Sequence, residues 1–208
     1  MKLKTTENIF VLGIFLGIVG VISALLLGVV SDVTRGPIAA AKARDFKNNL
    51  KLLVPDFDTT GEEKVFDGIT FFAAGKGGKT VAVFAKGETR DGYAGRIEVL
   101  AALDADGRVL RMMVTDNKET PGLGKDICDR KVSRTITNLF PDTTGIPPNP
   151  LLDQYNGKDT AARWAVKKDG GEFEFRTGAT VTSRALTALM GKIVNTYAAN
   201  RAAFAGGK

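Results

Sequence analysis

The chain has 208 residues, of which 44% are apolar, and it carries a formal net charge of +6 with no histidine and one cysteine, Cys128. The missing histidines exclude His-based catalytic triads, His-ligated haem and His-containing zinc sites, and a single cysteine excludes an internal disulfide, a thiolate-held iron–sulfur cluster and a cysteine-rich zinc site. Any redox group of this chain is therefore an organic cofactor. Acidic residues are scattered among the basic ones, which favours a solvated surface over a nucleic-acid-binding patch.

An uncharged segment near the N-terminus is the strongest single pattern. Residues 9–30 read IFVLGIFLGIVGVISALLLGVV, 22 residues without a charge. A helix of this length reaches about 33 Å, which crosses a hydrocarbon core of about 30 Å. The apolar region of a cleaved signal peptide spans only about 7–15 residues. We therefore predict a transmembrane helix over residues 9–30, and the lysines and arginines on its two sides are too balanced to orient it.

Small residues recur at four-residue spacing along this predicted helix. Gly13 and Gly17 form one series, and Gly20, Ala24 and Gly28 form a second. Small residues let helix backbones approach closely in lipid, so the pattern favours packing against partner helices. Glycine is common in membrane helices, so chance is the alternative explanation.

A helical linker is predicted between this span and the rest of the chain, over residues 31–60. Pro37 stands where a helix can begin, residues 38–53 favour helix, and Val54-Pro55-Asp56 ends it. The remaining residues, 61–208, are expected to form the soluble domain.

The predicted domain mixes strand and helix patterns. Apolar residues alternate along 81–85, 97–103 and 110–114, and an Asp/Gly turn at 104–107 joins the last two runs as a β-hairpin. A second hairpin is predicted over residues 164–175, and residues 142–158, rich in proline, asparagine and glycine, are predicted as a long irregular loop. An apolar stripe predicts a final helix over residues 183–200. Strands joined by hairpins and mixed with helices favour the α+β class, with an antiparallel sheet and flanking helices.

Hydroxyl side chains gather directly ahead of this last helix. The sequence there is Thr177-Gly178-Ala179-Thr180-Val181-Thr182-Ser183. A helix N-terminus presents unpaired N–H groups and a partial positive charge, which favour a phosphate, and glycine lets a ligand approach the backbone closely. The segment is therefore a candidate phosphate site. The alternative is an ordinary helix cap, for which threonine and serine are preferred.

Three motifs together resemble a known domain. Thr177-Gly178-Ala179-Thr180 matches the [Ser/Thr]-Gly-Ala-Thr flavinylation motif of the FMN-binding domain shared by the G subunit of Rnf electron transport complexes and the C subunit of the sodium-pumping NADH:quinone oxidoreductase. Glu119-Thr120-Pro121-Gly122-Leu123-Gly124 looks like the E-T-P-G-L-G loop of that family, and Gly92-Tyr93-Ala94-Gly95 is similar to its G-Y-x-G stretch. Their order and spacing behind one apolar segment extend the resemblance over nearly the whole chain. The chain length and the single span favour the Rnf G subunit.

The resemblance implies a covalent flavin site. In the family, the last threonine of the motif is joined to FMN by a phosphoester that a separate flavin transferase makes from FAD, and here that residue is Thr180. The other cofactor contacts implied by the resemblance are Thr177, Gly178, Ala179, Thr182, Glu119, Thr120, Gly122, Leu123 and Tyr93. Leu123 is expected on the face of the ring and Glu119 beside it, whereas Tyr93 is expected either near the flavin or partly buried in the core. No catalytic residue and no metal ligand is expected.

The resemblance also implies a function within a larger assembly. A member of the family would be an electron-transfer subunit of a membrane-bound Rnf complex, which couples electron flow between ferredoxin and NAD to ion translocation. Its partners would be the membrane subunits A, D and E, the iron–sulfur subunits B and C, membrane lipid and the flavin transferase, with no nucleic acid. It would cross the bacterial cytoplasmic membrane once, with residues 1–8 in the cytoplasm and the domain on the periplasmic side.

Two alternatives to this function stay open from the sequence. The first is the C subunit of a sodium-translocating NADH:quinone reductase. The second is an anchored extracytoplasmic binding or sensor domain without covalent flavin. One position departs from the family pattern, because the aspartate that often stands three residues before the motif is Glu174 here, which keeps a carboxylate but lengthens it. Cys128, in a predicted short helix after the E-T-P-G-L-G loop, is expected to be a buried, unreactive thiol.

Overall fold

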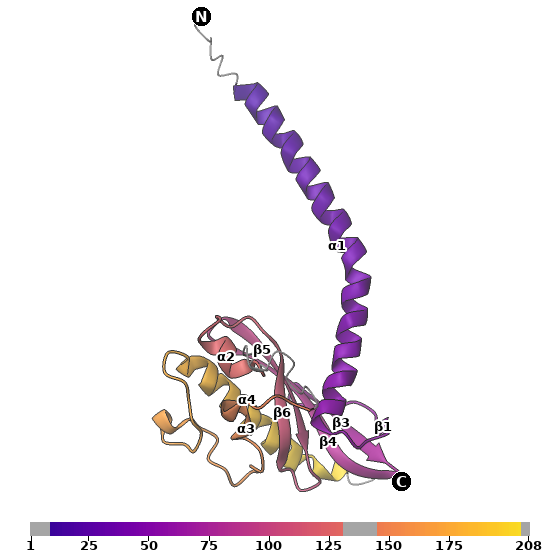
Figure 1. The fold of residues 1–208 in the computed structure, drawn as a ribbon, viewed down its shortest axis with the longest axis vertical. Helices are drawn as coiled ribbons and strands as arrows, with labels where there is room; N and C mark the ends of the chain where they lie inside the picture. Colours follow the sequence, from indigo (N-terminus) through magenta and orange to yellow (C-terminus); the bar gives the residue numbers. More distant parts are fainter. Residues whose placement is uncertain (1–8, 131–144, 205–208) are drawn as a thin grey trace, which may run out of the picture. The chain divides into compact units, whose positions relative to one another are not determined.

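The computed structural model describes residues 9–130 and 145–204 of the chain. The chain divides into two compact units, residues 1–48 and residues 49–208 (Figure 1). Most of the helix α1 (Ile9–Leu53) forms the first unit, and its last turn belongs to the second. The second unit contains the β-sheet and the remaining helices.

The helix α1 contains the whole predicted membrane span. From Val11 onward it is long and apolar enough to cross a membrane, and its apolar side chains, such as Leu16 and Leu27, are exposed. The predicted start of a new helix at Pro37 is wrong, because Pro37 lies inside α1. Proline removes one backbone hydrogen bond from a helix but keeps a helical φ, so the alanines at 39–41 that follow it continue the same helix.

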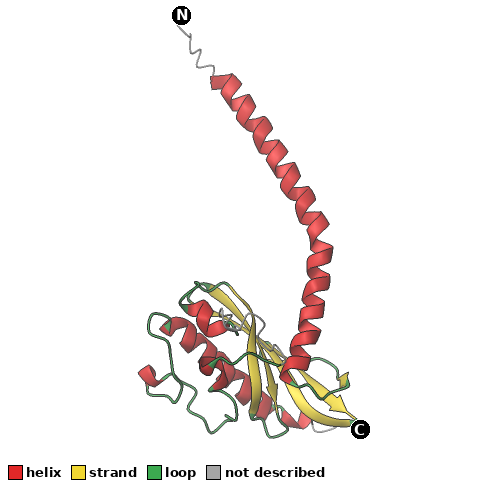
Figure 2. Cartoon of the chain, in the orientation of Figure 1, coloured by secondary structure: helices red, strands yellow, loops and turns green. Residues whose placement is uncertain are grey.

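A six-stranded antiparallel sheet forms the frame of the second unit (Figure 2). Its strands lie in the order β1 (Thr59–Thr60), β3 (Ile69–Lys76), β4 (Lys79–Gly92), β5 (Gly95–Leu103) and β6 (Val109–Asn117), and β2 (Lys64–Phe66) also pairs with β3. The predicted hairpin around residues 104–107 is confirmed as β5–β6. The helix α1 ends at Leu53, directly before Val54-Pro55-Asp56 as predicted, and strand β1 follows within the predicted linker over 31–60.

The last helix, α4 (Thr180–Ala199), covers one face of the sheet. The apolar stripe read from the sequence is the buried side of α4, and it joins the apolar side chains of β3, β4, β5 and β6 in one core. Gly87 of β4 lies under this stripe, where a Cβ would come within 3.2 Å of both Leu189 and Ile193. The helix begins three residues earlier than predicted, at Thr180.

The segment that follows α1 packs on the sheet through Phe57, on side chains that are not part of the core under α4. Leu50 and Leu53, in the last turn of α1, are buried in the second unit. Phe57 packs edge-on against Phe84 of β4 with ring centroids 5.3 Å apart, and Phe72 of β3 lies at the same distance from Phe84. Burial of both faces explains why β5 is buried along most of its length.

Four short helices complete the described part of the fold. They are α2 (Gly124–Cys128), α3 (Pro150–Asp153), η1 (Lys167–Asp169) and η2 (Arg201–Ala203). The predicted irregular loop over 142–158 contains α3, and its first three residues lie outside the described part of the chain. The α+β class with an antiparallel sheet and flanking helices is confirmed.

The second predicted hairpin, over residues 164–175, is wrong. A single bridge between Val166 and Phe173 replaces it, with the helix η1 between them. Trp164 and Phe173 stack with ring centroids 4.9 Å apart and pack with Tyr155 on the core, so both aromatic residues point the same way. Packing of the aromatic rings therefore outweighs the alternation that the sequence pattern indicated.

Gly171 makes this compact turn fit. A Cβ at residue 171 would overlap the backbone carbonyl of Ala165, which cannot move as a flexible side chain could. We expect Gly171→Ala to lower the free energy of unfolding by about 3 kcal/mol, because the clash forces the backbone apart. Denaturant unfolding of the full chain in detergent, followed by the fluorescence of Trp164, the single tryptophan, measures the change. Gly61→Ala is the matched control, because its Cβ would meet Ala73 at an ordinary 3.5 Å; equal stability of the two variants would contradict the expectation.

Candidate functional site

A pocket of about 440 Å³ lies where three distant segments of the sequence meet. They are the β4–β5 turn, the loop between β6 and α2, and the start of α4. The pocket is lined by Tyr93, Glu119, Thr120, Leu123, Gly124, Gly178, Ala179, Thr180, Val181 and Thr182. Eight of the ten residues predicted for the site line this pocket, and Thr177 and Gly122 do not. Gly124 and Val181 line it although they were not predicted. Gly124 stands in the loop motif itself, and the place of Val181 follows from the helix starting at Thr180.

The start of α4 presents its backbone to this pocket. Thr180 is the first helical residue, and the cap position before it is Ala179, which forms no side-chain cap. The Ser183 hydroxyl donates back to the Ala179 carbonyl over 3.0 Å. The first N–H groups of a helix have no acceptor within it, and no hydroxyl caps them here. The ordinary threonine or serine cap is thus excluded, and the arrangement of an anion-binding helix start remains.

The loop between β6 and α2 forms the facing wall. The N–H groups of Leu123 and Lys125 donate to the Thr120 carbonyl over 3.2 and 3.1 Å, and Gly122 has a φ of +80°. A glycine with positive φ at the third position of a Pro-Gly turn is expected of a type II turn. The turn carries Leu123 to the pocket, where its side chain is 43% exposed.

Two sets of polar contacts hold this loop to the segment before α4 and to the first turn of α4. The Arg176 guanidinium donates to the Gly122 carbonyl over 3.0 Å and lies 3.4 Å from a carboxylate oxygen of Asp126. The Thr182 hydroxyl donates to Glu119 over 2.9 Å, and both side chains are buried. The two motifs are therefore fixed to each other from the surface side and from the interior side.

The rim of the pocket is apolar and open to solvent. Leu123 and Val181 are 43% and 44% exposed, and Tyr93 in the β4–β5 turn is 74% exposed. The alternative expectation of a partly buried core position for Tyr93 is therefore wrong. Large apolar side chains that line a pocket and remain exposed are suited to contact a flat, largely apolar ligand.

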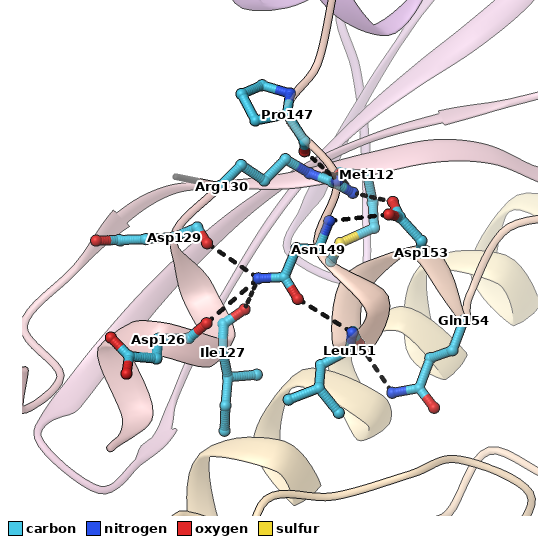
Figure 3. A network of polar contacts seen from close by, with 10 residues as sticks. All are labelled: Met112, Asp126, Ile127, Asp129, Arg130, Pro147, Asn149, Leu151, Asp153 and Gln154. Carbon is cyan, nitrogen blue, oxygen red and sulfur yellow. Dashed lines mark hydrogen bonds and ion pairs between the residues drawn. The ribbon is translucent and has the colours of Figure 1, made fainter. Parts of the chain in front are cut away.

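A second polar network supports the pocket loop from behind, at the far end of α2 (Figure 3). Asn149, which is 7% exposed, directs its amide group at the end of this helix. The amide donates to the carbonyls of Asp126, Ile127 and Asp129 over 3.3, 3.0 and 2.9 Å. Its side-chain oxygen accepts the Leu151 N–H at 3.0 Å, which makes Asn149 the N-cap of α3. One side chain thus satisfies backbone groups at the C-terminal end of α2 and at the N-terminal end of α3.

Arg130 extends this network to the sheet. Its guanidinium donates to the Met112 carbonyl of β6 and the Pro147 carbonyl, and it pairs with Asp153 over 2.7 Å. Asp153 in turn accepts the Asn149 N–H at 2.9 Å. The helix that follows the pocket loop is therefore tied to β6 and to α3 at once (Figure 3). Sequence patterns did not indicate this network, because its partners are far apart in the chain.

Removal of the Asn149 amide should weaken this support. We expect Asn149→Ala to lower the free energy of unfolding by about 1–3 kcal/mol, because buried carbonyls lose their donors. Denaturant unfolding of the full chain in detergent measures the loss. Asn195→Ala is the matched control, since Asn195 is exposed on α4 and alanine favours helix. Unchanged stability of Asn149→Ala would show that water replaces the amide without cost.

Cys128, the last residue of α2, is buried as predicted. Burial raises the pKa of its thiol to about 12, and the nearby charges of Glu119 and Asp129 act in the same direction. Burial likewise raises the pKa of Tyr155, whose hydroxyl lies 2.8 Å from that of Thr187, to about 12. A thiol with a raised pKa holds its proton at neutral pH and is a poor nucleophile.

The reactivity of Cys128 tests this environment. Burial raises the pKa of this thiol from an ordinary 9.0 to about 12, so at pH 8 the thiolate fraction of the folded chain is lower by roughly a thousandfold. We expect negligible alkylation by iodoacetamide at pH 8 in the folded chain and complete alkylation in denaturant. The rate should still be rising with pH above pH 10, where an ordinary thiol has reached its plateau. Fast alkylation of the folded chain at pH 8 would contradict the burial.

Comparison of the sequence with known proteins shows the family to which the chain belongs. The FMN-binding domain family matches residues 92–195, which include the whole lining of the pocket. The G subunit of the ion-translocating oxidoreductase complex of Cereibacter sphaeroides is 32% identical over 91% of this chain and 84% of its own length. The corresponding G subunit of Photorhabdus laumondii is 36% identical over 84% of this chain and 83% of its own. The chain belongs to the family of G subunits of ion-translocating oxidoreductase complexes.

Membership explains the features of the site together. A third relative, the G subunit of the complex of Haemophilus influenzae, is 32% identical over 84% of this chain and 83% of its own length. The family accounts for an FMN-binding domain behind one apolar helix, and thus for an electron-transport flavoprotein of a membrane complex. The resemblance drawn from the three motifs is confirmed.

Proposed function

We propose that this chain carries FMN in phosphoester linkage to Thr180 and relays electrons within an ion-translocating Rnf complex. One observation carries the proposal. Thr180 is the first residue of α4 and lines the pocket, where the helix has no side-chain cap, whereas the hydroxyl of Thr182, which also lines the pocket, donates to Glu119. Thr177, the other hydroxyl of the motif, does not line the pocket.

The residues of the pocket fit FMN. A volume of about 440 Å³ is within the range of about 300–1,000 Å³ typical of small-molecule sites. The free N–H groups at the start of α4 suit the phosphate, and Gly178, with a φ of +85°, leaves the approach to the backbone open. Leu123, Val181 and Tyr93 offer the apolar surface that the ring needs. Thr120 and Ala179 also line the pocket.

Attachment requires a second protein. A flavin transferase would use FAD as donor: the Thr180 oxygen forms a bond to the FMN phosphorus, the bond between the two phosphates breaks, AMP leaves, and the hydroxyl proton passes to a base of the transferase. Thr180 needs no activating side chain of its own for this step. Glu174, the lengthened carboxylate ahead of the motif, is exposed and forms an ion pair with Lys167, so a transferase would meet it on the surface.

The chain would act as a relay. Flavins accept electrons one or two at a time, and this chemistry belongs to the cofactor. The role of the protein is to hold the flavin ring at the open rim of the pocket, where another redox centre can approach it. Catalysis, with ferredoxin and NAD as electron carriers and an ion as the transported species, belongs to the assembled complex.

The partners and the location follow from this role. The helix α1 would place the chain in the bacterial cytoplasmic membrane beside the membrane subunits A, D and E, with residues 1–8 inside and the domain on the periplasmic side. The small-residue series along α1 would pack against those subunits. The iron–sulfur subunits B and C would be further partners in the complex. Covalent attachment would retain FMN on a side of the membrane where free flavin is scarce.

Replacement of Thr180 tests the attachment. We expect the full chain, coexpressed with a flavin transferase, to show the added mass of one FMN group and a fluorescent band in denaturing gels. Thr180→Ala should lose both signals completely, because the oxygen that forms the phosphoester is gone. Thr160→Ala, an exposed threonine outside the pocket, is the matched control and should keep them.

Two outcomes would contradict the proposal. An unmodified chain in the presence of a competent transferase would favour an anchored binding domain without covalent flavin. The set of proteins that copurifies in mild detergent checks the assembly: iron–sulfur partners support an Rnf complex, whereas their absence and the presence of quinone-reductase subunits would favour the C subunit of the sodium-translocating enzyme.

A further inference from the structure

A buried carboxylate stands in the wall of the pocket. Glu119 is only 4% exposed, yet it lines the cavity. Two glycines make room for it: a Cβ at residue 92 would lie 2.7 Å from one carboxylate oxygen, and a Cβ at residue 124 would overlap the other. Both Gly92 and Gly124 therefore have to lack a side chain where they face Glu119.

The carboxylate joins the two sides of the pocket. Its Oε1 accepts the Ala94 N–H of the β4–β5 turn at 3.2 Å, and its Oε2 accepts the Thr182 hydroxyl of α4 at 2.9 Å. Ala94 follows Tyr93 of the rim, and Thr182 lies two residues after Thr180. One side chain thus sets the separation between the rim tyrosine and the start of α4.

The negative charge of Glu119 is not neutralised by a neighbouring cation. Within residues 9–130 and 145–204, no lysine or arginine forms an ion pair with it, and its two hydrogen-bond donors are neutral. Both oxygens accept hydrogen bonds from these neutral groups, so no positive charge meets the carboxylate there. A charge so placed acts strongly on nearby groups, because little water screens it.

We propose that Glu119 is a positioning residue that fixes the Tyr93 turn against the start of α4 and whose charge lowers the reduction potential of the flavin. This inference rests on the proposed function. An electron added to a ring in the pocket would be repelled by the carboxylate, so the oxidised flavin is favoured. The chain itself, and not only the assembled complex, would then set the potential at which its flavin accepts electrons.

Glu119→Gln separates the charge from the geometry. The amide has the same shape as the carboxylate, its oxygen can still accept the Ala94 N–H, and its NH₂ group can donate to the Thr182 hydroxyl if that hydroxyl turns round. The charge is lost while both hydrogen bonds are kept. We expect a higher midpoint potential in spectroelectrochemical titration of the purified, flavin-loaded full chain. A tenfold change in the ratio of reduced to oxidised flavin corresponds to about 30 mV for a two-electron couple.

One control variant isolates this effect. Glu63→Gln removes an exposed carboxylate of a residue that does not line the pocket and should leave the midpoint potential unchanged. An unchanged potential in flavin-loaded Glu119→Gln would overturn the inference and leave the attachment to Thr180 intact. A wild-type chain without FMN would instead overturn the proposed function, so the two failures are distinguishable.

Thr182 provides an independent variant for the positioning role. Thr182→Val removes the hydroxyl and keeps the branched shape, and we expect lower fluorescence anisotropy of the bound flavin because the two walls are no longer joined. Thr182→Ser keeps the hydroxyl and should retain the wild-type anisotropy. If Glu119→Gln carries no flavin, this pair decides, and equal anisotropy in Thr182→Val and Thr182→Ser overturns the inference.

Discussion

The packing of α4 on the sheet is the constraint on which the rest of the second unit depends. Its buried stripe, with Leu186 and Met190 fully enclosed, meets the apolar side chains of four strands in one core. Gly87 lets the helix approach β4 closely at Leu189 and Ile193. Because the helix is rigid, this contact fixes its first turn over the pocket, so the position of Thr180 is determined by side chains several turns away.

The loop opposite α4 depends on polar contacts instead of apolar ones. Asn149 and Arg130 close the far end of α2, while Glu119 holds the near side of the loop to Thr182. Each of these groups is buried, so each would destabilise the fold if it lost its partners. The pocket is thus rigid at its walls and open at its rim, where Tyr93 is exposed. A flavin held in such a pocket would be fixed in place yet reachable by another redox centre.

Local sequence patterns predicted much of the fold and most of the residues that line the pocket. The β5–β6 hairpin, the stripe of the last helix and the apolar span were all visible because each depends on neighbouring residues. The hairpin predicted over 164–175 failed, since the stacking of Trp164 on Phe173 depends on where the core lies. The place of Tyr93 on the rim was likewise beyond the sequence, because an aromatic residue beside a turn suits both a core and a surface position.

The sequence by itself determined the class of redox group, the membrane span and the motif around Thr180, since composition, length and residue order are sufficient for these. The tertiary structure decided that the helix starts at Thr180 with no side-chain cap, and that the hydroxyl of Thr182 is directed to Glu119. These last two residues are 63 positions apart, so no periodicity or propensity connects them. Only the folding of the sheet, which brings the end of β6 and the start of α4 together, makes their contact and hence the pocket.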